Sequence, residues 1–143
     1  MGKRTRVVSR RTLAALVGAV GVAVVLGVGQ AAAATTVRVS VSSTGAQGNG
    51  PSVFDAISAD GRFVLFDSWA TNLIPGDTNG VRDVFLRDRL LGRTTRISVG
   101  PAGRQANAPS HGVAISSDGR VVLFESRATN LTNRADRNGN VDV

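Results

Sequence analysis

An internal repeat constrains the fold of this chain more than any other feature of its sequence. The segment ISADGRFVLFDS, residues 57–68, recurs as ISSDGRVVLFES, residues 115–126, and the similarity continues on both sides at an offset of 58. Over the 39 aligned pairs that start at Arg38, 22 are identical. A period of this length is typical of architectures in which each copy is one supersecondary unit. We assign repeat 1 to residues 38–95 and an incomplete repeat 2 to residues 96–143.

Two kinds of strand are predicted in the repeats. Residues 62–66 (RFVLF) are apolar on both alternating faces, which favours a strand buried between two layers. Residues 94–99 (TTRISV) alternate between a face of Thr, Ile and Val and a face that carries Arg96 and Ser98, which is typical of a half-exposed outer strand. TVRVSV, residues 36–41, repeats this alternation and predicts a second outer strand.

Turn residues are expected to connect these strands. Asp60 can accept hydrogen bonds from the turn backbone and Gly61 can take a positive φ, so a tight hairpin is predicted before RFVLF. Asp118 and Gly119 predict the same hairpin in repeat 2. With RDVFLRDR as a further strand, residues 54–99 are expected to hold four consecutive antiparallel strands. The predicted fold class is therefore all-β, with helix only in the N-terminal signal segment.

These segments resemble a known repeat. ISADGRFVLFDS, RDVFLRD and TTRIS together are similar to the TolB-like, WD-repeat-like propeller repeats of exported bacterial proteins, and ATNLIPGDTNGVRDVFLRDR resembles an extended-loop variant of actinobacterial type. The resemblance covers residues 35–143. It implies a β-propeller fragment with one outer strand, one full four-stranded blade and about half of a second.

The length of the chain decides how such a fragment is interpreted. Propellers close with roughly four to eight blades, so the chain is expected to be a truncated piece of a longer protein. One alternative is a ring assembled from several copies, which would self-associate through open blade edges. Another is a small sandwich that is stable by itself.

The first 34 residues are typical of an export signal. Five basic residues within the first eleven positions precede an uncharged apolar run over residues 12–29 and a small-residue segment, with cleavage expected near Ala34. Arg10 and Arg11 in SRRTLA resemble a twin-arginine signal. The alternative is a retained membrane anchor, because about 18 apolar residues suffice to cross a bilayer. The protein is therefore expected to be secreted or in the cell envelope, with membrane attachment only through this segment.

The net charge of +7 does not predict a nucleic-acid partner. It results from 17 Lys and Arg against 10 Asp and Glu, but five of the basic residues lie in the signal segment. Residues 35–143 therefore carry 12 against 10, which is the mixed surface of an ordinary domain. The chain has no cysteine, which excludes disulfides, thiolate metal sites and a cysteine nucleophile. No cofactor is expected.

A polar loop that occurs in both repeats offers candidate calcium ligands. These are Asp77, Asn79 and Asp83 in repeat 1 and Asp136, Asn138 and Asp142 in repeat 2. Clustered oxygen ligands suit calcium, although the spacing differs from that of an EF-hand loop. A plain Asn-Gly turn explains the same residues without an ion, and both interpretations stay open.

Two further residues stand out because the repeats do not share them. His111 is the only histidine and aligns with Val53; no nucleophile-elbow pattern accompanies it, so catalysis through it is not expected. Trp69 aligns with Arg127, and its ring is either a stacking platform for a sugar or peptide or a cover for the blade edge.

The absence of a catalytic set in the sequence, together with the resemblance, favours a non-enzymatic scaffold that binds a protein, peptide or glycan. The alternative is the accessory propeller of an exported hydrolase of prolyl-oligopeptidase type, whose catalytic domain would lie beyond Val143. The binding role follows from the resemblance alone, because one fold hosts many functions.

Overall fold

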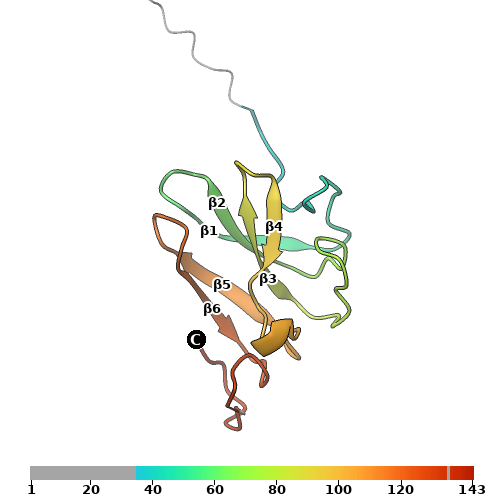
Figure 1. Ribbon diagram of the computed structural model, residues 1–143, viewed down its shortest axis with the longest axis vertical. Coiled ribbons are helices and arrows are strands. Elements are labelled where there is room, and N and C mark those ends of the chain that lie inside the picture. Colours follow the sequence, from blue (N-terminus) through green and yellow to red (C-terminus); the bar gives the residue numbers. More distant parts are fainter. Residues whose placement is uncertain (1–34, 135) are drawn as a thin grey trace, which may run out of the picture. The chain divides into compact units, whose positions relative to one another are not determined.

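The computed structural model describes residues 35–134 and 136–143 and consists of two antiparallel sheets (Figure 1). The first sheet has the order β1-β2-β3-β4, with strands Ser52–Ile57, Phe63–Ser68, Asp83–Asp88 and Arg93–Arg96. The second pairs β5 (Ser110–Ile115) with β6 (Val122–Ser126), and the short 3-10 turn η1 (Pro101–Gly103) precedes it. The described part of the chain is thus all-β, and its first four strands are consecutive and antiparallel, as predicted.

Strand β2 is buried on both faces, as its continuous apolar run predicts. On one face Phe66 stacks on Phe85, with ring centroids 5.6 Å apart, and Ala70 and Leu73 complete this cluster. On the other face Leu65 is fully buried, and strand β5 of repeat 2 packs across this side of the sheet. The core of the described residues therefore lies around β2, with the second sheet as one of its two covers.

The predicted hairpin between β1 and β2 is confirmed. Ser58 Oγ donates to Asp60 Oδ1 at 2.6 Å, the Arg62 amide donates to the same oxygen at 3.0 Å, and Gly61 has φ +69°. The hydrogen bond from Ser58 lowers the pKa of Asp60 because it favours the ionised carboxylate. Ser116 and Asp118 repeat this arrangement between β5 and β6.

The strand predicted over residues 94–99 is shorter in the structure, since β4 ends at Arg96, but the alternation continues to Val99 and its polar face is the buried one. Arg96 and Ser98 are buried, whereas Val99 is exposed. The reason is electrostatic, since Ser98 Oγ donates to Asp83 Oδ1 at 2.6 Å and Arg96 Nη1 lies 3.0 Å from Asp83 Oδ2. A buried arginine is tolerated where carboxylates and hydroxyls satisfy it.

The outer strand predicted over residues 36–41 does not form. Val41 makes only an isolated bridge to Gln47. Side chains replace the expected strand ladder, because Thr94 Oγ1 donates to the Val41 carbonyl at 2.5 Å and the Thr94 amide donates to Ser43 Oγ at 3.0 Å. The segment therefore lies against β4 without pairing with it as a strand.

The expected export signal, its cleavage site and the alternative membrane anchor lie outside the described residues. Within the described ranges, no helix is long and apolar enough to cross a bilayer.

Candidate functional site

Three titratable side chains meet between the two sheets. Asp55 comes from β1, Asp67 from β2 and His111 from β5, which packs across both strands. His111 Nδ1 lies 2.5 Å from Asp67 Oδ2 and 3.5 Å from Asp55 Oδ1. Both carboxylates are fully buried, whereas the His111 side chain is 44% exposed. The site therefore joins two acids of repeat 1 to the single histidine, which belongs to repeat 2.

Local backbone features bring these residues together. The pairing of β1 with β2 shifts between Phe54 and Ala56, so Asp55 is the extra residue of a β-bulge. Bulges re-aim a side chain, and here the carboxylate points toward β5. Gly112 of β5 leaves the space that it needs, because a Cβ atom at that position would overlap Asp55 Oδ2 and approach Leu65.

The two carboxylates are poorly compensated in charge. Arg82 Nη1 lies 3.8 Å from Asp67 Oδ2, and its guanidinium stacks over the Trp69 ring at 4.9 Å from the centroid. Burial, and then the neighbouring charge of Asp67, raise the pKa of Asp55 to about 6. Trp69, predicted as a stacking platform or an edge cover, thus has this arginine on one face.

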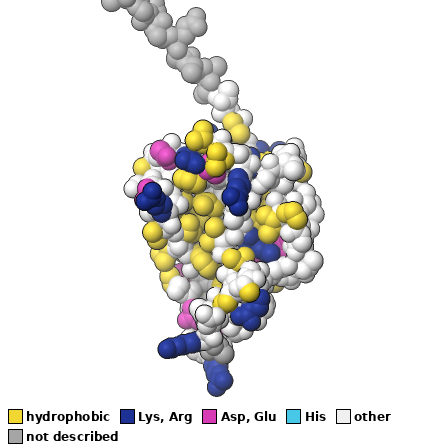
Figure 2. All heavy atoms as spheres, in the orientation of Figure 1, with side chains coloured by type: hydrophobic (Ala, Val, Ile, Leu, Met, Phe, Trp, Pro, Cys, Tyr) yellow, Lys and Arg dark blue, Asp and Glu magenta, His cyan; other side chains and the backbone are white. Residues whose placement is uncertain are grey.

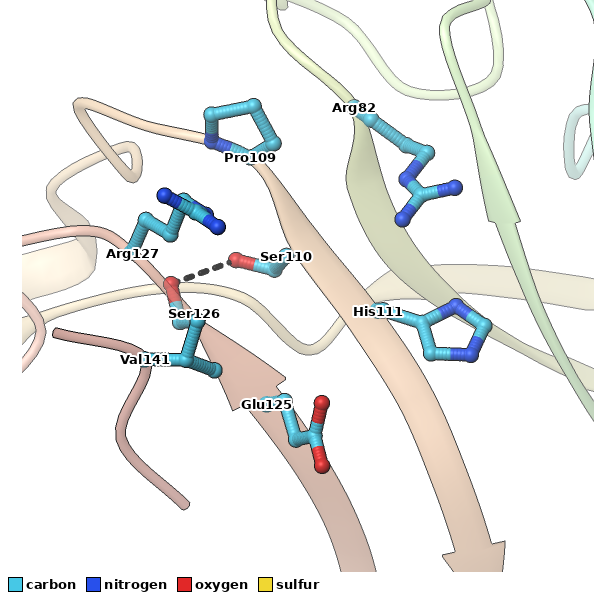
Figure 3. A pocket seen from close by; sticks show the side chains of 8 residues that line it. All are labelled: Arg82, Pro109, Ser110, His111, Glu125, Ser126, Arg127 and Val141. Carbon is cyan, nitrogen blue, oxygen red and sulfur yellow. Dashed lines mark hydrogen bonds between the residues drawn. The ribbon is translucent and has the colours of Figure 1, made fainter.

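His111 of this cluster also lines a small pocket (Figure 3). Its lining includes Arg82 immediately before β3, His111 on β5, and Glu125 opposite His111 on β6. Ser110 and Ser126, which also line the pocket, hydrogen-bond to each other at 2.9 Å. Solvent therefore reaches the histidine, while the carboxylates stay enclosed.

Sequence reasoning singled out His111 but missed Asp55 and Asp67. A signal was present, because residues 53–55 (VFD) align with residues 111–113 (HGV) and differ at all three positions, in the middle of otherwise similar segments. Because the two repeats otherwise share this strand, these three positions are candidates for a role that is specific to one repeat. What the sequence could not give is the distance between residues that belong to different repeats.

The polar loop of repeat 1 is organised around an arginine. Arg96 Nη1 lies 3.1 Å from Asp77 Oδ1 and 3.0 Å from Asp83 Oδ2, and Asn79 Nδ2 donates to Asp83 Oδ2 at 2.9 Å. Gln105 Oε1 accepts the Asn79 amide at 3.0 Å. Arg96 thus supplies the positive charge at the oxygens predicted as calcium ligands, and an ion there would compete with it.

The same loop in repeat 2 holds its candidate ligands in a more open turn. The Asn138 amide donates to Asp136 Oδ1 at 3.0 Å, and Asn138 Nδ2 donates to Asp142 Oδ1 at 3.3 Å. Gly139 has φ +69°, which agrees with the Asn-Gly turn interpretation. Calcium binding stays a prediction at both loops.

Comparisons with protein-family models, with curated proteins and with solved structures found no match for this chain. The arguments below therefore rest on the residues and their geometry.

The raised pKa of Asp55 predicts a pH-dependent stability. Because the folded-state pKa (about 6) lies above the usual value of 3.8, the folded chain holds this proton more tightly than the unfolded chain. The free energy of unfolding should therefore fall as the pH rises from about 4 to about 7. This holds for the wild-type chain, in which Asp67, His111 and Arg82 are the titratable groups around Asp55. Asp55→Asn should flatten this fall in urea titrations with EDTA at each pH. Equal slopes in the wild type and the variant would contradict the prediction.

Proposed function

We propose that this chain is part of an exported β-propeller of TolB-like type, which serves as a non-enzymatic scaffold for a protein, peptide or glycan. The observation that supports it best is that repeat 2 covers repeat 1 while its own equivalent face stays open. Propeller blades pack face to face in this way, each covering its neighbour.

Leu65 and Leu123 display this difference most directly. They occupy equivalent positions in the two repeats, yet Leu65 is fully buried and Leu123 is 45% exposed. Leu65 lies against Gly112 of β5, where an added Cβ would be 2.9 Å from Leu65 Cδ2. A third copy of the repeat, docked on β6 as β5 is docked on β2, would cover Leu123 in the same manner. Figure 2 shows apolar side chains that reach the surface of the face in view.

Residues that the two repeats share make the same local hydrogen bonds in each copy. In repeat 1 the Thr71 amide donates to Asn49 Oδ1 at 2.8 Å and Asn49 Nδ2 donates to Thr71 Oγ1 at 3.0 Å. Asn107 and Thr129 form the same pair of bonds in repeat 2, at 2.9 Å each. These bonds hold the loop before the first strand against the loop after the second. The ATNL motif therefore has a structural role that recurs with each copy.

The open face predicts self-association of the chain. Light scattering on the purified full-length chain should give a mass above the 14.8 kDa of one copy, because burying the β6 face removes apolar surface from water. Leu123→Asp should reduce that mass. The matched control is Leu90→Asp, which changes an exposed leucine in the β3–β4 turn and should leave the mass unaltered. The wild type and both variants carry the same N-terminal segment. Any association through that segment therefore does not affect the difference in mass between them.

A wild-type chain that is monomeric and unfolds cooperatively would contradict the proposal, since the β6 face would then need no cover. Peptide and glycan arrays probed with the labelled chain would identify the ligand class. Turnover of an array compound that depends on the described residues would contradict the non-enzymatic part.

A further inference from the structure

A set of three potential metal donors, two of them buried carboxylates, lies between the two repeats. Asp55, Asp67 and His111 each offer one atom, and these atoms all lie within 4.8 Å of one another. Carboxylate oxygen and imidazole nitrogen are ordinary donors to zinc and related first-row divalent ions. We propose that these three side chains bind a divalent transition-metal ion of the zinc class, which ties repeat 2 to repeat 1.

The carboxylates lack the partners that buried charges need. Both side chains are 0% exposed, and both oxygens of Asp55 and Oδ1 of Asp67 make no hydrogen bond of normal geometry among the described residues, although the Gly112 backbone and Asp67 lie close enough to Asp55 to influence its pKa. Buried carboxylates are normally paired, hydrogen-bonded or bound to a metal. Since His111 already shares Asp67 Oδ2, the unpartnered oxygens of Asp55 and Asp67 point to a further cation.

Arg82 does not meet this need. Its Nη1 atom is 3.8 Å from Asp67 Oδ2, beyond hydrogen-bond distance, and the guanidinium is held on the Trp69 ring. The two carboxylates therefore have one imidazole in contact and one guanidinium that lies beyond hydrogen-bond distance. A divalent cation would neutralise the two carboxylates directly, because it places its positive charge at the buried oxygens themselves.

The spacing of the donor atoms suits a small ion. Tetrahedral zinc with bonds of about 2.0–2.1 Å keeps its ligands about 3.3 Å apart. His111 Nδ1 lies 3.5 Å from Asp55 Oδ1, close to that value, whereas it is hydrogen-bonded to Asp67 Oδ2 at 2.5 Å. Zinc would therefore replace this hydrogen bond, and these two atoms would move apart by about 0.8 Å to reach the ligand spacing.

The donor residues are not part of the sequence pattern that the two repeats share. Val113 stands where repeat 1 has Asp55, and Val53 stands where repeat 2 has His111. Neither repeat contains the full donor set by itself, so the site exists only where two copies pack together. Valine at these positions is already compatible with the strand in the other repeat, which makes it the natural replacement for a test.

The single histidine gives the experiment a direct readout. The full-length chain, prepared without a histidine tag and with ¹⁵N-labelled imidazole, is treated with EDTA, dialysed and titrated with ZnCl₂. We expect the Nδ1 resonance of His111 to shift and to saturate at one zinc per chain. At a zinc concentration 100 times the Kd, the Tm should rise on the order of 10 °C.

Variants test each ligand. His111→Val and Asp55→Val should weaken zinc binding by more than about 100-fold, measured by calorimetry. Asp55→Asn, which preserves shape, repeats the test if the valine variant loses its β-rich circular dichroism. Asp142→Asn is the matched control, because it alters a carboxylate in the separate loop of repeat 2 and should bind zinc as the wild type does.

Several outcomes would overturn the proposal. One is a folded chain whose histidine resonances titrate with pH but do not respond to zinc, which would mean that a shared proton alone occupies the cluster. Others are unchanged zinc affinity in Asp55→Asn, or loss of binding in Asp142→Asn. An equal response to calcium or magnesium would overturn the assignment to the zinc class.

Discussion

Replacing Arg96 by methionine is expected to lower the free energy of unfolding by about 3–5 kcal/mol. The Arg96 side chain is only 6% exposed and lies between Asp77 and Asp83, with Nη1 at 3.1 and 3.0 Å from their oxygens. Methionine keeps the apolar stem and removes the charge. The cost arises because two buried carboxylates then lose their shared cation, which is worse than removing the whole cluster.

Urea unfolding of the Arg96→Met chain measures this effect. Arg93→Met is the matched control, since Arg93 is exposed at the other end of the same strand and should change stability by no more than about 0.5 kcal/mol. A loss below about 1 kcal/mol for Arg96→Met would show that the cluster is not a stabilising network. Recovery of stability with CaCl₂ in this variant alone would show that Asp77 and Asp83 can hold calcium once the guanidinium is absent.

The second large effect is expected at Phe66. This ring is 1% exposed and stacks on Phe85 in the cluster that fills one face of the first sheet. Phe66→Ala should destabilise the fold by about 3–5 kcal/mol, because it removes buried apolar surface and leaves a cavity that the sheet cannot close.

Thermal and urea unfolding of the Phe66→Ala chain test this expectation. Phe54→Ala provides the matched control, because Phe54 is a strand phenylalanine that is 62% exposed. Its replacement should change the free energy of unfolding by about 0.5 kcal/mol or less. If both substitutions lowered the free energy of unfolding by the same amount, the core would not lie between Phe66 of β2 and Phe85 of β3.

Local features were predictable because they depend on neighbours in the sequence. The Asp60-Gly61 turn is one, since the Ser58 and Arg62 groups that hold Asp60 lie within two residues of it. The continuous apolar run of β2 is another, because a strand without a polar face has to be covered twice. Four consecutive antiparallel strands followed from these signals.

Predictions became less accurate where side chains compete with the backbone. The segment over residues 36–41 has the alternation of an outer strand, yet the hydroxyls of Ser43 and Thr94 take over the bonds that a ladder would make. Hydropathy also did not decide which face of the segment over residues 94–99 is buried. Asp83 places Arg96 and Ser98 inside, and the alternation itself is compatible with either orientation.

By itself, the sequence determined the all-β class, the repeat and its period, the turns and the buried central strand, because each is encoded by residues close together in the chain. Only the tertiary structure decided that His111 meets Asp55 and Asp67. His111 and Asp67 are 44 positions apart, and their contact depends on a bulge at Asp55, the space beside Gly112 and the packing of β5 across β1 and β2. Such a site depends on the packing of one sheet against the other, which no local pattern in the chain records.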